Sequence, residues 1–357
     1  MKRPVVVAGV VVGLLSVLGA GAVRAQSAIA AAGVIESTEG GFRFPDATLQ
    51  LTAALGGPLQ NVIRVSASGG DFTSIEDALA SIVAPSATNR FLVDVGPGEY
   101  EETGLLSVTA YVHLRGAGPN VTRIVSTRTS NSPSGNAAVV LLADRGRVSD
   151  LAIRNSGTAD TFAIGIYSSF ATRETVVDNV TIDIDGAGGV GHYAMYLNDS
   201  ELTIDRSTLR ARGAPGEGTS VNAAIGLVNV SGGFPRPLVR NSLLNGGSGA
   251  DLDCGGSSQT GFGVQAVNAS PVIVGSQVCG DFRAMAVYTA GTPQVQGSVL
   301  WVGSSTGAFL VETSGSVSFQ VATSGAFHAG NVETGVGTIT CTQSYKASYT
   351  DANATCG

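Results

Sequence analysis

The sequence predicts an all-β solenoid, in which short strands wind into stacked coils around one apolar core. A unit of two short apolar strands separated by a polar turn recurs between residues 120 and 340, at spacings of 21 to 35 residues. Glycine accounts for 49 of the 357 residues, and only 13% of the residues are charged. Narrow coil interiors favour small uncharged side chains and tight corners favour glycine, so composition and periodicity agree.

The repeat consists of two alternating motifs. Taking the residue after the first apolar position as a marker places the first motif at 149, 178, 205, 240, 275 and 296. The second motif, rich in small and apolar residues, lies between successive markers, at 163–167, 193–197, 224–228, 263–267 and 285–288. One such coil cannot bury its apolar side chains alone, whereas stacked coils share a continuous core. An antiparallel β-sandwich with evenly spaced strands is the alternative, which the paired motifs disfavour.

Residues 1–25 have the pattern of an export signal peptide. Lys2 and Arg3 precede a long uncharged apolar run, and small residues provide cleavage positions after Ala22 and Ala25, of which we favour Ala25. The run approaches membrane-spanning length, so retention as an anchor is the alternative. Cleavage predicts a secreted or periplasmic protein without a membrane association.

Residues 26–61 are predicted to be a flexible linker that contains a short hairpin. Phe42 and Phe44 alternate with polar residues before a Pro-Asp turn, and Leu49 and Leu51 alternate after it. The stretch resembles a G-G-F-x-F-P-D-G-T segment of bacterial surface and phage-tail-like proteins. That resemblance spans about a dozen residues and implies an attachment element at most.

The solenoid is predicted to occupy residues 62–340. Near its start, strands are expected at 62–65, 91–95 and within 111–116. Thr73 and Glu76 have the spacing of a capping box, which opens a helix with an apolar stripe of Ile75, Leu79, Ile82 and Val83. A bare solenoid end would expose unpaired strand edges, so this helix is expected to cover the N-terminal end.

Three segments of this region resemble the opening of pectinesterases and of the wider pectin-lyase-like family. They are S-G-G-D-F-T-S-I at 68–75, G-P-G-E-Y-E-E at 96–102 and L-R-G-A-G at 114–118. The resemblance covers about 65 residues and implies a single-stranded right-handed parallel β-helix with an N-terminal capping helix. It implies little about chemistry, because the family's catalytic residues come later in the chain.

The catalytic motifs of that family are missing here. A pectinesterase-like site needs two carboxylates, glutamine donors and an arginine, but only Gln265-Ala266-Val267 matches part of one motif. A polygalacturonase-like site needs three aspartates and a G-H-G, of which Gly191-His192-Tyr193 is a partial match. The sequence therefore favours a protein without these activities.

A lyase-like site is the remaining enzymatic hypothesis, and it would use Ca²⁺ held by an acidic cluster. Aspartates that could meet if coils align are Asp178, Asp183, Asp185, Asp199 and Asp205, with Arg206, Arg210 and Arg212 nearby. Ordinary ladders of solvated ion pairs are the alternative and the favoured interpretation. No cofactor is therefore predicted, and Ca²⁺ enters only with the lyase hypothesis.

Insertions in successive coils provide the candidate ligand site. Extra residues occur at 186–191, 213–218 and 245–261, in equivalent places of their coils. They should rise together as a wall beside one sheet face, where pectin-lyase-like proteins bind polysaccharide; loop growth without function is the alternative. Aromatic and acidic groups suit contacts with sugar rings and hydroxyls, which makes the candidate residues His192, Tyr193, Glu217, Asp251 and Asp253.

The four cysteines predict two disulfides. Cys254, Cys279, Cys341 and Cys356 all follow the signal segment and lack the C-x-x-C spacing of a metal site. Three pairings are possible, and proximity in sequence favours Cys254–Cys279 and Cys341–Cys356. The second would close a tail at 341–357 over the far end of the solenoid.

The preferred function is that of a secreted, non-enzymatic β-helix protein that binds a polysaccharide or a cell surface, or that serves as a structural spacer. A carbohydrate-active enzyme of pectinesterase-like or lyase-like type is the alternative. With 20 Lys and Arg against 27 Asp and Glu, the net charge is −7, and no basic stripe is present. A nucleic-acid partner is therefore not expected.

Overall fold

The structure, a computed structural model, divides into two compact units, residues 1–57 and 58–357. The residues that it describes are 42–43, 49–50, 61–157, 161–185, 190–213, 221–247, 261–303 and the short strands between 308 and 346. In the first unit, β1 (Phe42–Arg43) pairs antiparallel with β2 (Leu49–Gln50). The signal-like segment lies outside the described residues. No helix within the described part is long and apolar enough to cross a membrane.

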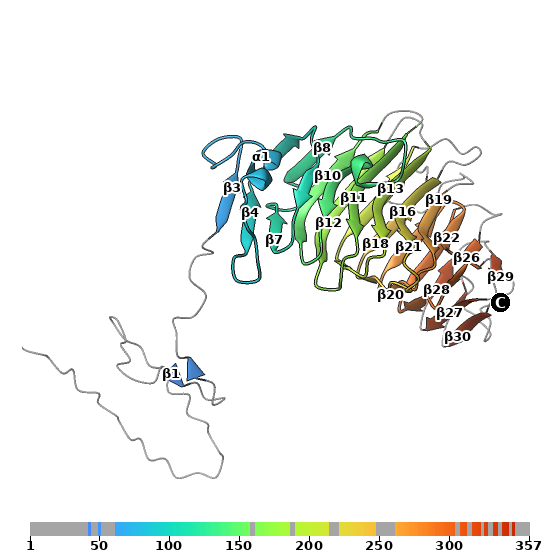
Figure 1. Cartoon of the computed structure of the whole chain (residues 1–357). Helices are drawn as coiled ribbons and strands as arrows, with labels where there is room; N and C mark the ends of the chain where they lie inside the picture. Colours follow the sequence, from blue (N-terminus) through green and yellow to red (C-terminus); the bar gives the residue numbers. More distant parts are fainter. Residues whose placement is uncertain are drawn as a thin grey trace, which may run out of the picture. The chain divides into compact units, whose positions relative to one another are not determined.

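The second unit is a right-handed parallel β-helix, because all ladders between its named strands are parallel and each coil contributes one strand to each of three sheets (Figure 1). This confirms the fold class predicted from the repeats and the resemblance. Sheet 1 stacks β3 (Val62–Val65), β4 (Phe91–Val95), β7 (Val112–Arg115), the start of β10 (Arg147–Asn155), the start of β12 (Val176–Asp185), β14 (Thr203–Asp205), β17 (Leu238–Arg240), β20 (Val272–Val274), β24 (Gln294–Gln296), β27 (Ser316–Ala322) and β30 (Thr338–Thr342).

The other two sheets complete each coil. Sheet 2 stacks β5 (Gly98–Glu101), β8 (Thr122–Ser126), the ends of β10 and β12, β15 (Thr208–Arg212), β18 (Leu243–Gly246), β21 (Gln277–Gly280), β25 (Val299–Val302), β28 (Gly325–Phe327) and β31 (Tyr345–Lys346). Sheet 3 stacks β6 (Leu106–Val108), β9 (Ala138–Leu142), β11 (Phe162–Ser169), β13 (Gly191–Asn198), β16 (Val221–Val228), β19 (Gly261–Val267), β22 (Arg283–Tyr288), β26 (Ala308–Glu312) and β29 (Asn331–Thr334). A short 3₁₀ helix, η1 (Gly135–Ala137), precedes β9, and β23 (Ala290–Gly291) pairs with the start of β27.

One residue per coil forms the corner between sheets 1 and 2, and it has a positive φ. These residues are Asp150, Asn179, Arg206, Asn241, Gly275 and Gly297, with φ between 48° and 57°. Asn, Asp and Gly tolerate this left-handed conformation best, which explains the polar turn of the repeat. The register pairs Val274 with Arg240 and with Gln296, so the fifth marker is Val274 and not the predicted Gly275. Gly275 is the corner itself.

A ladder of buried serines lies directly behind this corner. Each Oγ accepts an N–H from the preceding coil: Val180 donates to Ser207, Ser207 to Ser242, Ser242 to Ser276 and Ser276 to Ser298, at 3.1–3.2 Å. Each hydroxyl in turn donates to the carbonyl two residues before it, as Ser242 does to Arg240 at 2.7 Å. The ladder satisfies backbone groups that the sharp corner removes from strand pairing.

The N-terminal end carries the predicted helix, α1 (Ile75–Ala80), beside β3 and β4 (Figure 1). Ser74 is the N-cap, and its Oγ accepts from Asp77 N at 3.3 Å. The buried carboxylate of Glu102 accepts from Ile75 N at 2.6 Å, which places a negative charge at the positive end of the helix.

Two details of the predicted helix were wrong. The N-cap is Ser74 and not Thr73, because Glu102 supplies the carboxylate that the capping box had assigned to Glu76. The helix ends at Ala80, so Val83 falls outside the apolar stripe and is 75% exposed. Ile75, Ala78 and Leu79 are buried in the core at the end of the solenoid, as the stripe requires.

The core is one apolar cluster that extends from Val65 in β3 to Val321 in β27 and draws on all three sheets. Strand alternation produces it: in β12, Val177, Val180, Ile182 and Ile184 face inward, and polar residues between them face outward. Strand pairing continues past the predicted end at residue 340, through β31.

The disulfides stay predictions. Cys279 is buried in β21, where the register places it between Asn245 and Trp301 of the neighbouring coils. Cys254 and Cys356 lie outside the described residues. Cys341 belongs to β30, and its side chain is not among those described.

Candidate functional site

The three predicted insertions connect sheet 2 to sheet 3 in consecutive coils. They join β12 to β13, β15 to β16 and β18 to β19. The strands that follow them, β13, β16 and β19, stack in register, so all three insertions lead into the same edge of sheet 3. Glu217, Asp251 and Asp253 belong to these insertions and lie outside the described residues. His192 and Tyr193 begin β13 at the same edge.

His192 does not reach the surface. Its side chain is 0% exposed, and its Nδ1–H donates to the carbonyl oxygen of Arg212 at 2.7 Å. The register aligns it with Ala163 and Asn222, which are also fully buried. Since neighbouring residues of a strand face opposite sides, His192 packs inside the solenoid while Tyr193 faces outward. The prediction of His192 as a ligand contact is therefore wrong.

Tyr193 belongs to a second apolar cluster on the outer face of sheet 3. The phenol of Tyr193 is 7% exposed and packs edge-on against Tyr196, with ring centroids 5.0 Å apart. Tyr196 stacks in turn on Tyr167 of the preceding coil, at 6.0 Å and an interplanar angle of 7°. Burial raises the pKa of the Tyr193 and Tyr196 phenols, so both are neutral hydrogen-bonding groups.

A glycine makes room for these rings. Gly226 lies beside Tyr196 in the next coil, and a Cβ there would come within 2.7 Å of the Tyr193 ring. Any side chain at this position would displace the tyrosines from the sheet. The two rings therefore fit against the sheet because the neighbouring strand leaves space for them.

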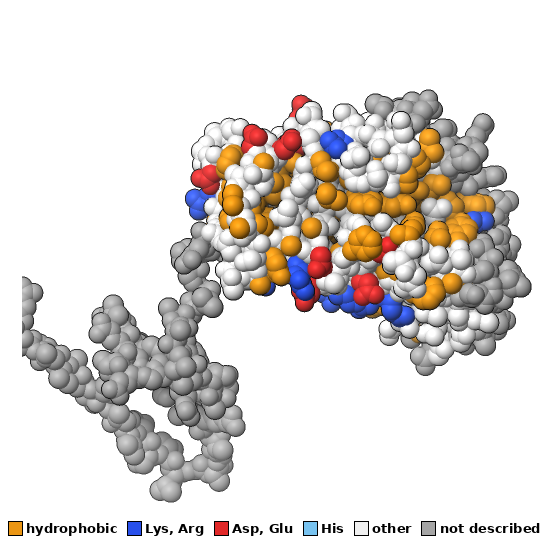
Figure 2. Space-filling model, in the orientation of Figure 1, with side chains coloured by type: hydrophobic (Ala, Val, Ile, Leu, Met, Phe, Trp, Pro, Cys, Tyr) orange, Lys and Arg blue, Asp and Glu red, His pale blue; other side chains and the backbone are white. Residues whose placement is uncertain are grey.

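The aromatic surface continues into later coils. Phe262 and Phe282 meet edge-on at 6.3 Å, and the guanidinium of Arg283 lies 4.5 Å from the Phe282 ring centroid. Arg283 Nη1 also donates to Tyr288 Oη at 2.8 Å. We call this surface the aromatic face and define it by Tyr167, Tyr193, Tyr196, Phe262, Phe282 and Tyr288. Figure 2 shows hydrophobic side chains gathered in a band along the solenoid over these strands.

Carboxylates are missing from the strands beneath the aromatic face. The seven strands of sheet 3 from β6 to β22 contain no Asp or Glu. The polar outward residues among them are neutral, as with Asn198 and Gln265, or cationic, as with Arg283. These strands therefore lack the pair of carboxylates that ester or glycoside hydrolysis requires.

Four of the five aspartates considered for Ca²⁺ lie on sheets 1 and 2 and have arginine partners, and the fifth, Asp199, does not. On sheet 1, Asp178 pairs with Arg147 and Arg206, both at 2.8 Å, and Asp205 pairs with Arg240 at 2.9 Å. On sheet 2, Arg212 bridges Asp183 and Asp185 at 3.0 and 3.3 Å, and in the turn after β13 Asp199 accepts from Ser231 Oγ. Among the described residues, no three His, Cys, Asp or Glu side chains gather as a metal site would require. The arrangement is a set of ion-pair ladders.

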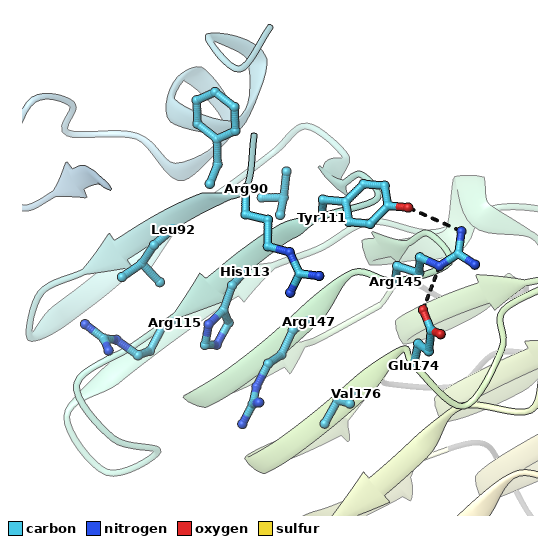
Figure 3. A pocket seen from close by; sticks show the side chains of 11 residues that line it. Arg90, Leu92, Tyr111, His113, Arg115, Arg145, Arg147, Glu174 and Val176 are labelled. Atoms are coloured by element: carbon cyan, nitrogen blue, oxygen red, sulfur yellow. Dashed lines mark hydrogen bonds and ion pairs between the residues drawn. The ribbon is translucent and has the colours of Figure 1, made fainter. Parts of the chain in front are cut away.

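A cavity of about 610 Å³ lies on the outer face of sheet 1, over the first coils (Figure 3). Four arginines and one glutamate line it, together with Tyr111, His113 and apolar residues: Arg90, Arg115, Arg145, Arg147, Glu174, Phe91, Leu92, Val112 and Val176. The sequence analysis missed this site, because its residues come from separate coils. The signal available in the sequence was the alternation of strands at 112–115 and 147–149, which sends His113 and two of the arginines outward.

The floor of this cavity is a short hydrogen-bond chain. Ser149 Oγ donates to Asp150 Oδ2 at 2.8 Å, so His113 Nε2–H donates to Ser149 Oγ, also at 2.8 Å. Burial, followed by the charges of Arg147 and Arg115, lowers the pKa of His113 to about 4. The serine is 1% exposed and bound on both sides. It is therefore a structural link and is not placed to attack a ligand.

Comparisons with known proteins give similarity at the level of solved structures only. No protein-family model and no curated protein matches the chain. The chain is similar to pectin methylesterase from carrot (TM-score 0.46, 14% identity, 84% of this chain and 86% of that chain), to pectin methylesterase from Erwinia chrysanthemi (0.41, 16%, 84% and 92%) and to DFA-IIIase from Arthrobacter chlorophenolicus (0.46, 13%, 81% and 80%). Similarity at this level carries no argument about activity. The fold assignment rests on the strand pairing of the chain itself.

Proposed function

We propose that this chain is an exported, non-catalytic glycan-binding protein, and that its binding surface is the aromatic face of sheet 3. One observation carries the proposal: tyrosine and phenylalanine rings lie on the coils of β11, β13, β19 and β22, in a sheet whose strands from β6 to β22 contain no carboxylate. The signal-like pattern of residues 1–25 supports export.

The chemistry of the aromatic face suits a sugar polymer. Sugar rings present apolar faces and hydroxyl edges, and tyrosine offers a ring to the first and a hydroxyl to the second. Tyr167, Tyr196 and Tyr288 are half-buried, so part of each side chain stays accessible while packing holds the ring. Tyr167 and Tyr196 are in register on adjacent strands, and Tyr193 and Phe262 share a second row that passes through Ala223. The rings are therefore spread over several coils, and a linear chain of sugars could contact more than one of them.

The positions of the carboxylates favour a protein without hydrolytic activity. Hydrolysis of a glycosidic or ester bond uses an acid and a base or nucleophile, in most cases two carboxylates. The strands under the aromatic face supply none, and Asp178, Asp183 and Asp205 of sheets 1 and 2 are engaged by arginines. Asp150 accepts hydrogen bonds from Ser149 and Asn179. A carbohydrate-active enzyme is the competing hypothesis, and the insertions could supply carboxylates to it.

The test measures binding of the mature chain to soluble polysaccharides by isothermal titration calorimetry, using a neutral glucan, esterified pectin, alginate and peptidoglycan fragments. The double variant Tyr167→Ala/Tyr196→Ala should weaken binding at least about tenfold, because truncated aromatic anchors dominate contact energies. Phe170→Ala is the matched control, since Phe170 is an aromatic residue 63% exposed in the turn after β11, and it should bind as the wild type does.

Two results would overturn the proposal. One is unchanged affinity in the double variant with a fold verified by circular dichroism. The other is release of methanol, reducing ends or unsaturated products by the wild-type protein, which would support the enzyme hypothesis instead.

A further inference from the structure

We propose that the cavity on the outer face of sheet 1 is an anion-binding site, which takes a compact organic ligand through a phosphate, sulfate or carboxylate group. This site is separate from the aromatic face: it lies on another sheet, over the first coils, and shares no residue with that face. Anion binding at this cavity can therefore be tested independently of glycan binding at the aromatic face.

The lining carries an excess of positive charge in a protein of net charge −7. Four guanidinium groups meet there from three successive coils, and Glu174 is the one carboxylate in the lining. Figure 3 shows Arg90, His113 and Arg147 projecting from neighbouring strands on the same side of the sheet. Three of the four arginines have carboxylate partners: Arg115 pairs with Asp94, Arg145 with Asp144 and Glu174, and Arg147 with Asp178. Arg90 forms no ion pair with a described carboxylate, so an anion in the cavity would supply its missing partner.

The arginines retain hydrogen-bond donors for a ligand. Arg90 makes no ion pair with any described carboxylate; its Nε donates to Ala87 O at 3.2 Å. Arg147 uses only Nη2, in its bond with Asp178. Each guanidinium has five N–H donors in a rigid fork that matches the oxygens of a carboxylate, sulfate or phosphate. Arg90 and Arg147 therefore supply most of the free donors.

The cavity is held in shape before any ligand arrives. Tyr111 lies between two arginines, with its ring centroid 5.8 Å from the guanidinium of Arg90 and 5.9 Å from that of Arg145. Arg145 Nη1 donates to Tyr111 Oη at 3.3 Å, and its Nε donates to Glu174 at 2.7 Å. Fixed donors lose little freedom on binding, which favours affinity.

Two turns place side chains at the cavity. Tyr111 and Arg145 precede the strands there and have φ of +64° and +60°, as other corner residues of the solenoid do. Both turns bring their side chains, the phenol and the guanidinium, to the cavity lining.

His113 lines the cavity beside two of its arginines. Burial, and then Arg147 and Arg115, disfavour its charged form, while Asp150 and Asp178 act in the opposite direction. With Nε2–H donated to Ser149, the Nδ1 atom forms no hydrogen bond with the described residues. An anion in the cavity would favour protonation of Nδ1, so the pKa of His113 should rise when the ligand binds.

The volume argues for an organic ligand. A cavity of about 610 Å³ lies in the range of small-molecule sites, and a bare ion would fill little of it. Leu92 and Val176 provide apolar contacts for the uncharged part. The floor holds no accessible nucleophile, so binding and not reaction is expected.

The experiment titrates the full chain with glucose 6-phosphate, glucose 6-sulfate, glucuronate, glucose and inorganic sulfate, by calorimetry at low ionic strength. The three charged sugars should bind, the phosphate dianion most tightly, and glucose should not. Arg90→Gln/Arg147→Gln should weaken binding at least about tenfold, since each loses hydrogen bonds to a charged group. The control Arg240→Gln removes an arginine from sheet 1 away from the cavity and should leave binding unchanged.

NMR supplies a second readout that does not depend on variants. The pKa of His113 should rise by at least one unit in the presence of glucose 6-phosphate and should be unmoved by glucose. The proposed anion site would be wrong if none of the anions bound, or if glucose bound as tightly as glucose 6-phosphate. It would also be wrong if the pKa of His113 did not change on addition of glucose 6-phosphate. If inorganic sulfate bound as tightly as glucose 6-sulfate, the sugar would contribute no affinity, and the proposal of an organic ligand would be wrong.

Discussion

The outer faces of sheet 1 and sheet 3 share one backbone plan and one core, yet they differ in almost every exposed side chain. Sheet 1 carries rows of arginines and aspartates joined by ion pairs, with an excess of arginine in the cavity over its first coils. Sheet 3 carries aromatic rings, and its strands from β6 to β22 hold no carboxylate. Inward positions are dictated by packing, so the outward positions distinguish one face from the other.

His113 and His192 show how strongly alternation decides this difference. Both are the second residue of a strand. His113 faces outward and forms the floor of a cationic cavity, whereas His192 faces inward and hydrogen-bonds a backbone carbonyl. A shift of one residue in either strand would exchange their environments.

The largest expected effect tests whether both faces depend on the same core. Leu114 is 0% exposed in β7, between the outward residues His113 and Arg115. Leu114→Ala should lower the free energy of unfolding by about 2–5 kcal/mol. Arg240→Gln, which removes an exposed ion pair, should lower it by about 1 kcal/mol or less. Chemical denaturation of both variants measures these changes. Equal decreases in the free energy of unfolding would mean that the shared apolar core does not dominate the stability of the two faces.

The next effect is a pH dependence that belongs to sheet 1 alone. The pKa of His113 is about 4 in the folded chain, below the value of about 6.5 in the unfolded chain. Between pH 4 and pH 6.5, His113 is therefore protonated in the unfolded chain and neutral in the folded chain. The contribution of His113 to the free energy of unfolding should be fully present above pH 6.5. The free energy of unfolding should then fall by up to about 3 kcal/mol as the pH drops to 4. The groups facing His113 are Arg147, Arg115, Asp150 and Asp178.

Denaturation curves of the wild type and His113→Gln across this window isolate the contribution of the histidine. The difference between the two curves should shrink as the pH falls. A constant difference would show that His113 titrates near its ordinary pKa, so that burial and the neighbouring arginines do not disfavour its charged form.

A smaller effect concerns the corner that connects sheets 1 and 2. Ser242 is 5% exposed, and its Oγ accepts from Ser207 N and donates to Arg240 O. Ser242→Ala leaves a buried N–H without its partner, which should cost about 1–3 kcal/mol. The control Ser132→Ala changes an exposed serine and should cost less than about 0.5 kcal/mol. Equal costs would show that the ladder does not stabilise the corner.

The sequence predicted the features that repeat. Apolar positions in each coil, the polar corners, the N-terminal helix and the common edge of the three insertions all follow from periodicity. The fifth marker was displaced by one residue, because Val274 and Gly275 both fit an apolar-then-polar pattern and only the pairing with Arg240 separates them.

The sequence could not predict the features that depend on register between coils. Arg90, Arg115 and Arg147 are more than 20 residues apart in sequence, and they share a cavity only because their strands stack side by side. The carboxylate of Glu102 at the helix N-terminus has the same origin. Tyr193 was a candidate for its residue type, but the contact of its neighbour Tyr196 with Tyr167 depends on the stacking of β11 on β13.

We expect the two outer faces to bind different ligands. Titration of the wild type, Tyr167→Ala/Tyr196→Ala and Arg90→Gln/Arg147→Gln with two ligands each tests this directly; the ligands are the polysaccharide that the wild type binds and glucose 6-phosphate. The tyrosine variant should lose at least about tenfold in affinity for the polysaccharide and keep its affinity for glucose 6-phosphate, and the arginine variant should do the reverse. Separate binding sites would be contradicted if one variant lost affinity for both ligands. They would also be contradicted if both variants kept wild-type affinity for both ligands.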